Sequence, residues 1–142
     1  MKLELMITEN EVIESVAKYL IEDGWTIIQK LTTSQKGVDL IASKENKTLF
    51  IEAKGGTSSL ASSSRYGKSF NGNQAKSHIG SALWKIGQMM TEEPNGEFAL
   101  ALPNEKTHRL LINDIKAMLL KLNLKIFWVD LNDRIEIEQN NG

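Results

Sequence analysis

Apolar residues near the start of the chain recur every three or four positions, which is the period of an amphipathic α-helix. Thr8 and Glu11 precede this stripe in a capping-box pattern, and Asp23-Gly24 follows it. We therefore predict a helix of about 14 residues. Its buried side chains should be those of Val12, Ile13, Val16, Ala17 and Leu20. The next segment, residues 25–31, is rich in β-branched residues and predicts a strand.

Two further segments rich in β-branched and aromatic residues follow, and a short polar stretch separates them. They are residues 37–42 and 49–55, with the polar stretch at 44–47. This arrangement predicts a β-hairpin, in which Asn46 can adopt the left-handed backbone of a tight turn. If Glu45 and Asn46 are the two central turn residues, the numbers of paired residues sum to 91.

Because side chains alternate along a strand, the two faces of this hairpin differ. One face is wholly apolar and carries Val38, Leu40, Ala42, Leu49, Ile51 and Ala53. On the other face Asp39 stands opposite Glu52, with the carboxylates within roughly 5 Å and Lys54 one step further along. Two carboxylates at this spacing destabilise each other unless a cation lies between them, and their hard oxygen atoms suit Mg²⁺ or Mn²⁺.

The same charges also fit a hairpin whose outer face lies in solvent, where Glu52 and Lys54 would have no special role. Ile41 and Phe50 share the charged face, however, so that face should be at least partly covered. Charged groups on a partly buried face usually have a function. The pattern therefore favours a functional cluster.

A second helical stripe begins after Asn73, which can cap it, and ends at Pro94-Asn95-Gly96. A polar row runs beside this stripe, where it could form the wall of a cleft. The row consists of Gln74, His78, Ser81 and Lys85.

The remainder of the chain predicts a strand at 98–102, a helix at 107–121 and strands at 125–129 and 134–138. Apolar strands that alternate with helices after an opening hairpin indicate an α/β sandwich with a mixed sheet. A length of 142 residues suggests that residues 1–142 form a single domain.

Composition narrows the class of protein. A hydrophobic content of 41% and a charged content of 25% are ordinary for a globular protein. The absence of cysteine excludes disulfides and thiolate zinc sites. No apolar run approaches the ~20 residues of a membrane span, and the N-terminus lacks an export signal. We therefore expect a cytoplasmic protein that does not enter a membrane.

Charge is distributed unevenly along the chain. Residues 54–91 contain five basic residues and no acidic one, so this segment carries +5. The other 12 basic and 18 acidic residues give −6, and the net charge of −1 hides this asymmetry. A basic zone directly after the proposed site should attract a phosphate backbone.

Within this zone, residues 55–73 are rich in glycine and serine, and we expect a long mobile loop. Tyr66 and Phe70 of this loop could stack on bases. The candidate nucleic-acid contacts of the zone are Arg65, Lys68, Lys76, His78 and Lys85.

Asp39, followed thirteen residues later by Glu52-Ala53-Lys54, resembles the motif of the PD-(D/E)XK nuclease superfamily, although Val38 stands where the motif has proline. The resemblance implies a restriction-endonuclease-like α/β/α sandwich with a central mixed sheet. It also implies that Asp39, Glu52 and the carbonyl of Ala53 hold Mg²⁺ or Mn²⁺, and that Lys54 orients the attacking water.

Two further residues follow from this resemblance. A glutamate of the first helix reaches the metal in many such nucleases, and Glu14, at the margin of the apolar stripe, is the candidate. Glu9, Glu11 and Glu22 of the same helix are expected to be surface charges. Gln74 matches a glutamine that several branches of the superfamily carry near the active site.

The function expected from these residues is a metal-dependent nuclease that hydrolyses phosphodiester bonds, with DNA as the expected substrate. Two alternatives stay open. One is a non-catalytic member of the fold that binds nucleic acid or acts as a scaffold, and the other is a nuclease subunit that is active only as an oligomer, such as a homodimer, or with a partner.

Overall fold

The computed structural model describes residues 7–32, 35–56 and 72–139. These residues form four α-helices and six β-strands. In chain order the elements are α1 (Glu9–Glu22), β1 (Thr26–Lys30), β2 (Leu40–Lys44), β3 (Lys47–Ala53), α2 (Gly72–Glu92), β4 (Glu97–Pro103), α3 (Lys106–Asp114), α4 (Lys116–Leu122), β5 (Lys125–Val129) and β6 (Ile135–Glu138).

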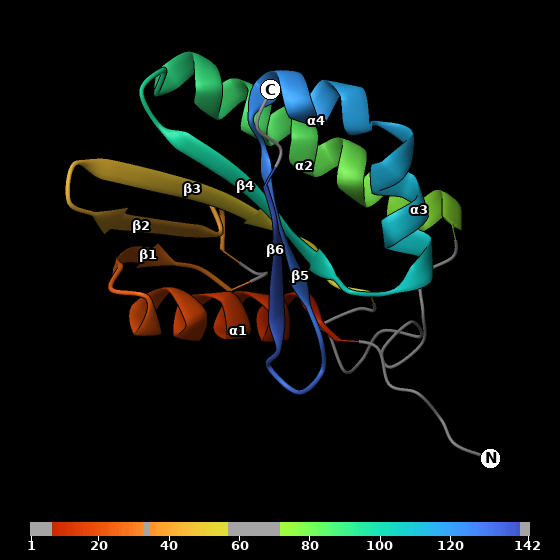
Figure 1. Ribbon diagram of the computed structural model, residues 1–142, viewed down its shortest axis with the longest axis horizontal. Helices are drawn as coiled ribbons and strands as arrows, with labels where there is room; N and C mark the ends of the chain where they lie inside the picture. Colours follow the sequence, from red (N-terminus) through yellow and green to blue (C-terminus); the bar gives the residue numbers. More distant parts are fainter. Residues whose placement is uncertain (1–6, 33–34, 57–71, 140–142) are drawn as a thin grey trace.

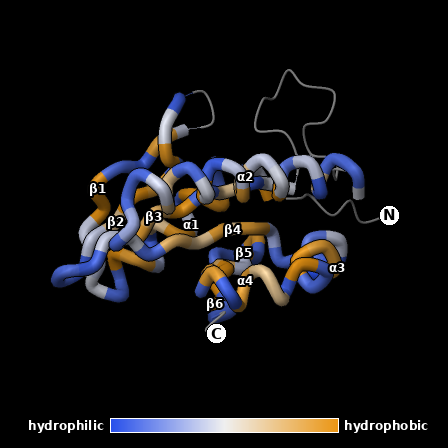
Figure 2. Tube along the Cα trace, turned by 90° about the horizontal axis from the view of Figure 1, so that it is seen from above, coloured by the Kyte–Doolittle hydropathy of each residue, from blue (hydrophilic) through white to orange (hydrophobic). Residues whose placement is uncertain are grey.

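The six strands form one mixed sheet in the order of the sequence, β1-β2-β3-β4-β5-β6. β1, β2 and β3 form an antiparallel meander, β4 and β5 continue parallel to β3, and β6 pairs antiparallel at the far edge. The two parallel pairings need crossover connections, which α2 and the α3–α4 segment supply. β4, hydrophobic over most of its length, runs through the middle of the fold (Figure 2).

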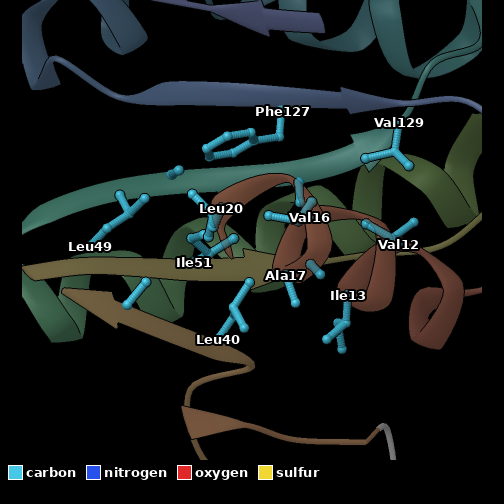
Figure 3. Close-up of a cluster of buried hydrophobic side chains, with 14 of the residues drawn as sticks. Val12, Ile13, Val16, Ala17, Leu20, Leu40, Leu49, Ile51, Phe127 and Val129 are labelled. Atoms are coloured by element: carbon cyan, nitrogen blue, oxygen red, sulfur yellow. The ribbon is translucent and has the colours of Figure 1, made fainter. Parts of the chain in front are cut away.

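Helices cover both faces of the sheet. α1 lies against one face, and α2, α3 and α4 lie on the other (Figure 1). Each layer encloses its own core. Side chains of α1 pack onto strands β2, β3 and β5 in the first core, which Figure 3 shows with Val16, Leu20, Leu40, Ile51 and Phe127 among its members. The second core lies under α2, α3 and α4. The predicted α/β sandwich with a mixed sheet is therefore confirmed.

The predicted register of the hairpin is also confirmed, since Leu40 pairs with Ile51 and Lys44 with Lys47. Two details differ. Glu45, not Asn46, has the left-handed backbone of the turn, with φ of 55°. Val38 packs against the second core and not with Leu40, because residues 37–39 precede β2 and strand alternation does not extend to them.

Two helix predictions need correction. The helix expected at 107–121 is divided at Ile115, whose φ of −115° and ψ of 20° interrupt the helical backbone. Both halves contribute to the second core, through Ile112 and Leu119. α2 begins at Gly72, so Asn73 lies inside it and does not cap it.

Residues 57–71 of the predicted loop lie outside the described residues, and Arg65 and Lys68 are among them. Within the described part of the chain, no helix is long and apolar enough to cross a membrane.

Candidate active site

The short segment before β2 fixes the position of Asp39. Its first residue, Gly37, has a φ of +131°, a conformation that favours glycine. The side-chain amide of Gln29 donates a hydrogen bond of 2.7 Å to the carbonyl of Val38. The N–H of Leu31 donates one of 2.9 Å to the carbonyl of Asp39. β1 and the residue after it therefore hold the backbone on both sides of the Asp39 side chain.

Asp39 and Glu52 are linked through each other's strands. Oδ2 of Asp39 accepts a hydrogen bond of 2.8 Å from the N–H of Ala53. Oε2 of Glu52 accepts one of 3.3 Å from the N–H of Asp39. Only 7% of Asp39 and 1% of Glu52 is exposed. Each carboxylate thus has one oxygen fixed by the backbone and a second oxygen that is not engaged in that bond.

Burial raises the pKa of both carboxyl groups above their ordinary values, because an ionised carboxylate loses its hydration. Asp39 raises the pKa of Glu52 further through repulsion. The ammonium of Lys85, which lies on α2 with Nζ 3.7 Å from Oε1 of Glu52, acts in the opposite direction. The pair therefore favours a cation beside it.

Lys54 follows the last residue of β3. Its N–H donates a hydrogen bond of 3.0 Å to the carbonyl of Ala101 in β4. Because successive peptide groups of a strand point to opposite sides, the N–H and C=O of Ala53 both point toward Asp39. Lys54 is half-buried and lowers the pKa of Asp39 and Glu52, so its ammonium acts on the same cluster.

The start of α1 approaches this cluster closely. A Cβ on Gly55 would lie 2.3 Å from the backbone nitrogen of Glu9 and 2.7 Å from the carbonyl carbon of Thr8, so this contact requires glycine. The N–H of Gly56 also donates a hydrogen bond of 2.8 Å to the carbonyl of Ile7. The two glycines after Lys54 thus bring the first turn of α1 to the carboxylate pair.

Glu9 is the glutamate of α1 that this contact brings to the cluster. Burial raises its pKa from 4.5 to about 7, and repulsion from Asp39 and Glu52 adds to the shift. The expectation that Glu9 is an ordinary surface charge is therefore wrong. A signal was present in the sequence, because Gly55-Gly56 directly after Lys54 is typical of a close backbone approach.

The structure does not bring Glu14 to the carboxylate pair. Its carboxylate lies 2.8 Å from Nζ of Lys30, and 65% of its side chain is exposed. Five residues separate Glu14 from Glu9, which turns the side chain about 140° around the helix axis. A position beside the apolar stripe of α1 does not identify the glutamate near the pair. The start of α1, and not the side of the helix, meets the end of β3.

The polar row of α2 lies along the same side of the sheet as the carboxylates. Lys85 contacts Glu52 as described. Burial lowers the pKa of His78, and the charge of Lys54 lowers it further. Gln74 is half-buried one turn before His78, whereas Lys76 is exposed.

A cleft of about 210 Å³ opens over Glu52. Its walls are Gly37 and Val38 before β2 and Lys85, Gln88, Met89 and Glu92 of α2. A larger hollow of about 900 Å³ lies elsewhere, beside Phe98 and Leu122, and none of the site carboxylates lines it. The cleft at Glu52 therefore brings a cavity to the carboxylate pair.

The residues present fit a magnesium ion. Across the described ranges, no three His, Cys, Asp or Glu side chains are arranged to hold a metal. Mg²⁺ does not need such a cage, since it usually keeps several waters and binds through one or two carboxylates. Asp39, Glu52 and the carbonyl of Ala53 provide that kind of donor set, with the repulsion described above as a reason to bind a cation.

Comparison with protein-family models gives no match, and comparison with curated proteins gives none either. Among solved structures, a FdxN element excision controlling factor protein from Anabaena variabilis is similar to this chain, with a TM-score of 0.57 and 24% sequence identity. The similarity covers 92% of this chain and 99% of that one. At this identity it supports a shared fold, over nearly the whole chain, and nothing finer.

Proposed function

We propose that this protein is a metal-dependent nuclease that hydrolyses phosphodiester bonds, with DNA as its substrate. The observation that carries the proposal is the buried pair of Asp39 and Glu52, held by each other's strands, with Lys54 at the carboxyl end of β3. Carboxylates that were only structural would be expected to pair with cations or lie in solvent. Glu52 has one such cation, Lys85 at 3.7 Å, but Asp39 still repels it, and Glu52 lines an open cleft.

Each residue of the cluster has a task in the proposed reaction. Asp39, Glu52 and the carbonyl of Ala53 would hold Mg²⁺ or Mn²⁺, which when bound polarises a phosphate and lowers the pKa of a nearby water. The ammonium of Lys54 would orient the attacking water and neutralise charge that develops on the phosphate. Glu9, with a pKa of about 7, suits a group that accepts a proton at neutral pH.

Two observations support nucleic acid as the substrate. The first is positive charge: the ammonium groups of Lys54 and Lys85 act on the carboxylate cluster, and Lys76 of α2 is exposed. These charges would attract a phosphate backbone. The similar protein from Anabaena variabilis has a name that concerns the excision of an element, which is in keeping with a DNA substrate.

The test is cleavage of supercoiled, linear, single-stranded and branched DNA, and of RNA, with Mg²⁺, Mn²⁺ or EDTA. The variants are Asp39→Asn and Lys54→Met. The control is Glu14→Gln, because Glu14 pairs with Lys30 of β1 and not with a residue of the carboxylate cluster. We expect metal-dependent cutting that both site variants abolish and the control retains. Cutting that survives in EDTA or in Asp39→Asn would overturn the proposal.

A second candidate is a subunit that acts only with a partner. The word "controlling" in the name of the similar protein favours it, as does the contact of Lys85 with Glu52, which partly neutralises the pair. Binding of metal and DNA without cutting by the isolated chain would support this candidate. Light scattering would show whether the partner is a second copy of the chain.

A further inference from the structure

Trp84 is exposed to an unusual degree for an indole, with 72% of its surface in solvent. The other two tryptophans are used in packing, since Trp128 is 1% exposed and Trp25 packs against the first core. Trp84 lies in the middle of α2. This helix forms part of one outer layer of the sandwich (Figure 1). The core of the described fold does not use this ring.

The neighbours of Trp84 on the helix leave its ring uncovered. Side chains three and four residues away are those that can pack against it, and here they are Gly80, Ser81, Gly87 and Gln88. A Cβ on Gly80 or Gly87 would meet nothing within 4 Å, so no crowding requires glycine there. Glycine inside a helix is less favourable than alanine by about 1 kcal/mol. Gly80 and Gly87 therefore lower the stability of the helix, and they leave both sides of the Trp84 ring uncovered.

Trp84 also belongs to the part of α2 that borders the proposed active site. The next residue, Lys85, contacts Glu52, and Gln88, one turn after Trp84, lines the cleft. One residue turns the helix by about 100°, so the indole stands beside the cleft and not inside it. From Gly72 to Thr91 the helix carries Lys76 and Lys85 and no acidic residue, and Glu92 is the acid at its far end. A strand whose phosphate lay near Lys85 in the cleft would thus have this ring one residue away along the helix.

We infer that Trp84 stacks on an unpaired base next to the phosphate held in the cleft, and that the preferred substrate is therefore a single-stranded or frayed nucleic acid. This inference rests on the nuclease proposal. The bases of an intact duplex are stacked on one another, so their faces are closed to a side chain, whereas each unpaired base offers a free aromatic face. The lysines of α2 and Lys54 would hold the backbone of the same strand by its charge.

The direct test uses the emission of Trp84, because it is the exposed indole of the described fold. The protein is titrated in EDTA, so that no metal-dependent cutting occurs, with an oligothymidine and with a hairpin duplex of equal charge. We expect the oligothymidine to quench the emission and the duplex to leave it nearly unchanged. A Trp84→Phe variant should lose the quenching while it still binds.

Affinity is then measured by anisotropy with labelled DNA. Trp84→Ala should weaken binding of the single strand about tenfold, the scale expected from one base stacked on an aromatic ring, and weaken binding of the duplex less than about twofold. Gly87→Leu, which places a side chain beside the ring, should weaken single-strand binding in the same direction. The control is Ile28→Ala, since Ile28 is also largely exposed, at 59%, but lies on β1.

The outcomes separate this inference from the nuclease proposal. Equal binding of both DNAs by wild type and Trp84→Ala, with metal-dependent cutting intact, would overturn the role of Trp84 and leave the nuclease proposal standing. Loss of self-association in Trp84→Ala, with unchanged DNA binding, would also overturn it and would assign the ring to a protein contact. Absence of binding to either DNA, together with absence of cutting, would overturn both.

Discussion

Replacing Glu9 by glutamine should make the metal-free protein less sensitive to rising pH. Glu9 has a pKa of about 7 in the folded protein and 4.5 as the ordinary value, a difference of 2.5 units. Between these values the folded state holds a proton that the unfolded state has lost, so the free energy of unfolding falls as pH rises. The stabilisation is complete below the ordinary value and is gone above about pH 7.

The size of the effect follows from the shift. A change of 2.5 units corresponds to about 3 kcal/mol. Solvent around this half-buried side chain screens part of that value, so we expect about 2 kcal/mol. The helix dipole favours a negative charge in the first turn by a few tenths of a kcal/mol, which would lower the pKa of Glu9. Burial and repulsion outweigh this effect, so the pKa is raised. Glu9→Gln should therefore stabilise the protein at about pH 8 and have little effect at about pH 5.

Urea unfolding in EDTA, followed by circular dichroism at both pH values, measures this difference. The control is Glu14→Gln on the same helix, which removes only a surface ion pair with Lys30 and should change stability by less than about 1 kcal/mol at either pH. If wild type and Glu9→Gln lost the same free energy of unfolding between the two pH values, the pKa of Glu9 would not be raised in the folded protein.

Three other predictions concern the site and its surroundings. Gly55→Ala should destabilise the protein by about 2 kcal/mol, because its Cβ would lie 2.3 Å from the backbone of Glu9. Gly80→Ala, in open space, should stabilise the protein by about 1 kcal/mol. Equal effects of the two substitutions in urea unfolding would contradict the close contact at Gly55. Mg²⁺ at a hundred times its dissociation constant should raise the free energy of unfolding of wild type by about 2.7 kcal/mol. The free energy of unfolding of Asp39→Asn should rise far less. An equal rise in both proteins would mean that Asp39 does not bind the metal. Lys85→Met should weaken DNA binding and lower the slope of its salt dependence by about one phosphate contact, and an unchanged slope would mean that Lys85 contacts no phosphate.

Much of the site follows from local pattern. The hairpin turn sets the predicted register, in which Leu40 pairs with Ile51. This register places Asp39, the residue before β2, beside Glu52. The polar row of α2 was likewise visible as a stripe, and Lys85 does contact Glu52. These relations depend on a turn of two residues and on helical periodicity, both of which are properties of neighbouring residues in the chain.

Contacts between distant segments were harder to predict. The first-helix glutamate near the pair is Glu9 and not Glu14, and nothing in the periodicity of α1 distinguishes them. The difference depends on how Gly55 seats the end of β3 against the start of α1. A similar limit applies at Ile115, where the backbone leaves the helical conformation although the apolar period continues through it in the sequence.

The sequence by itself determined the layered class of the fold, the hairpin and the facing carboxylates, because period and turn chemistry act over a few residues. Only the tertiary structure decided which glutamate of α1 lies near the pair, how deeply the pair is buried and that Trp84 of α2 stays exposed. Those features arise where helices dock on the sheet. Docking depends on the shapes of two complementary surfaces, and no single stretch of the chain contains both of them.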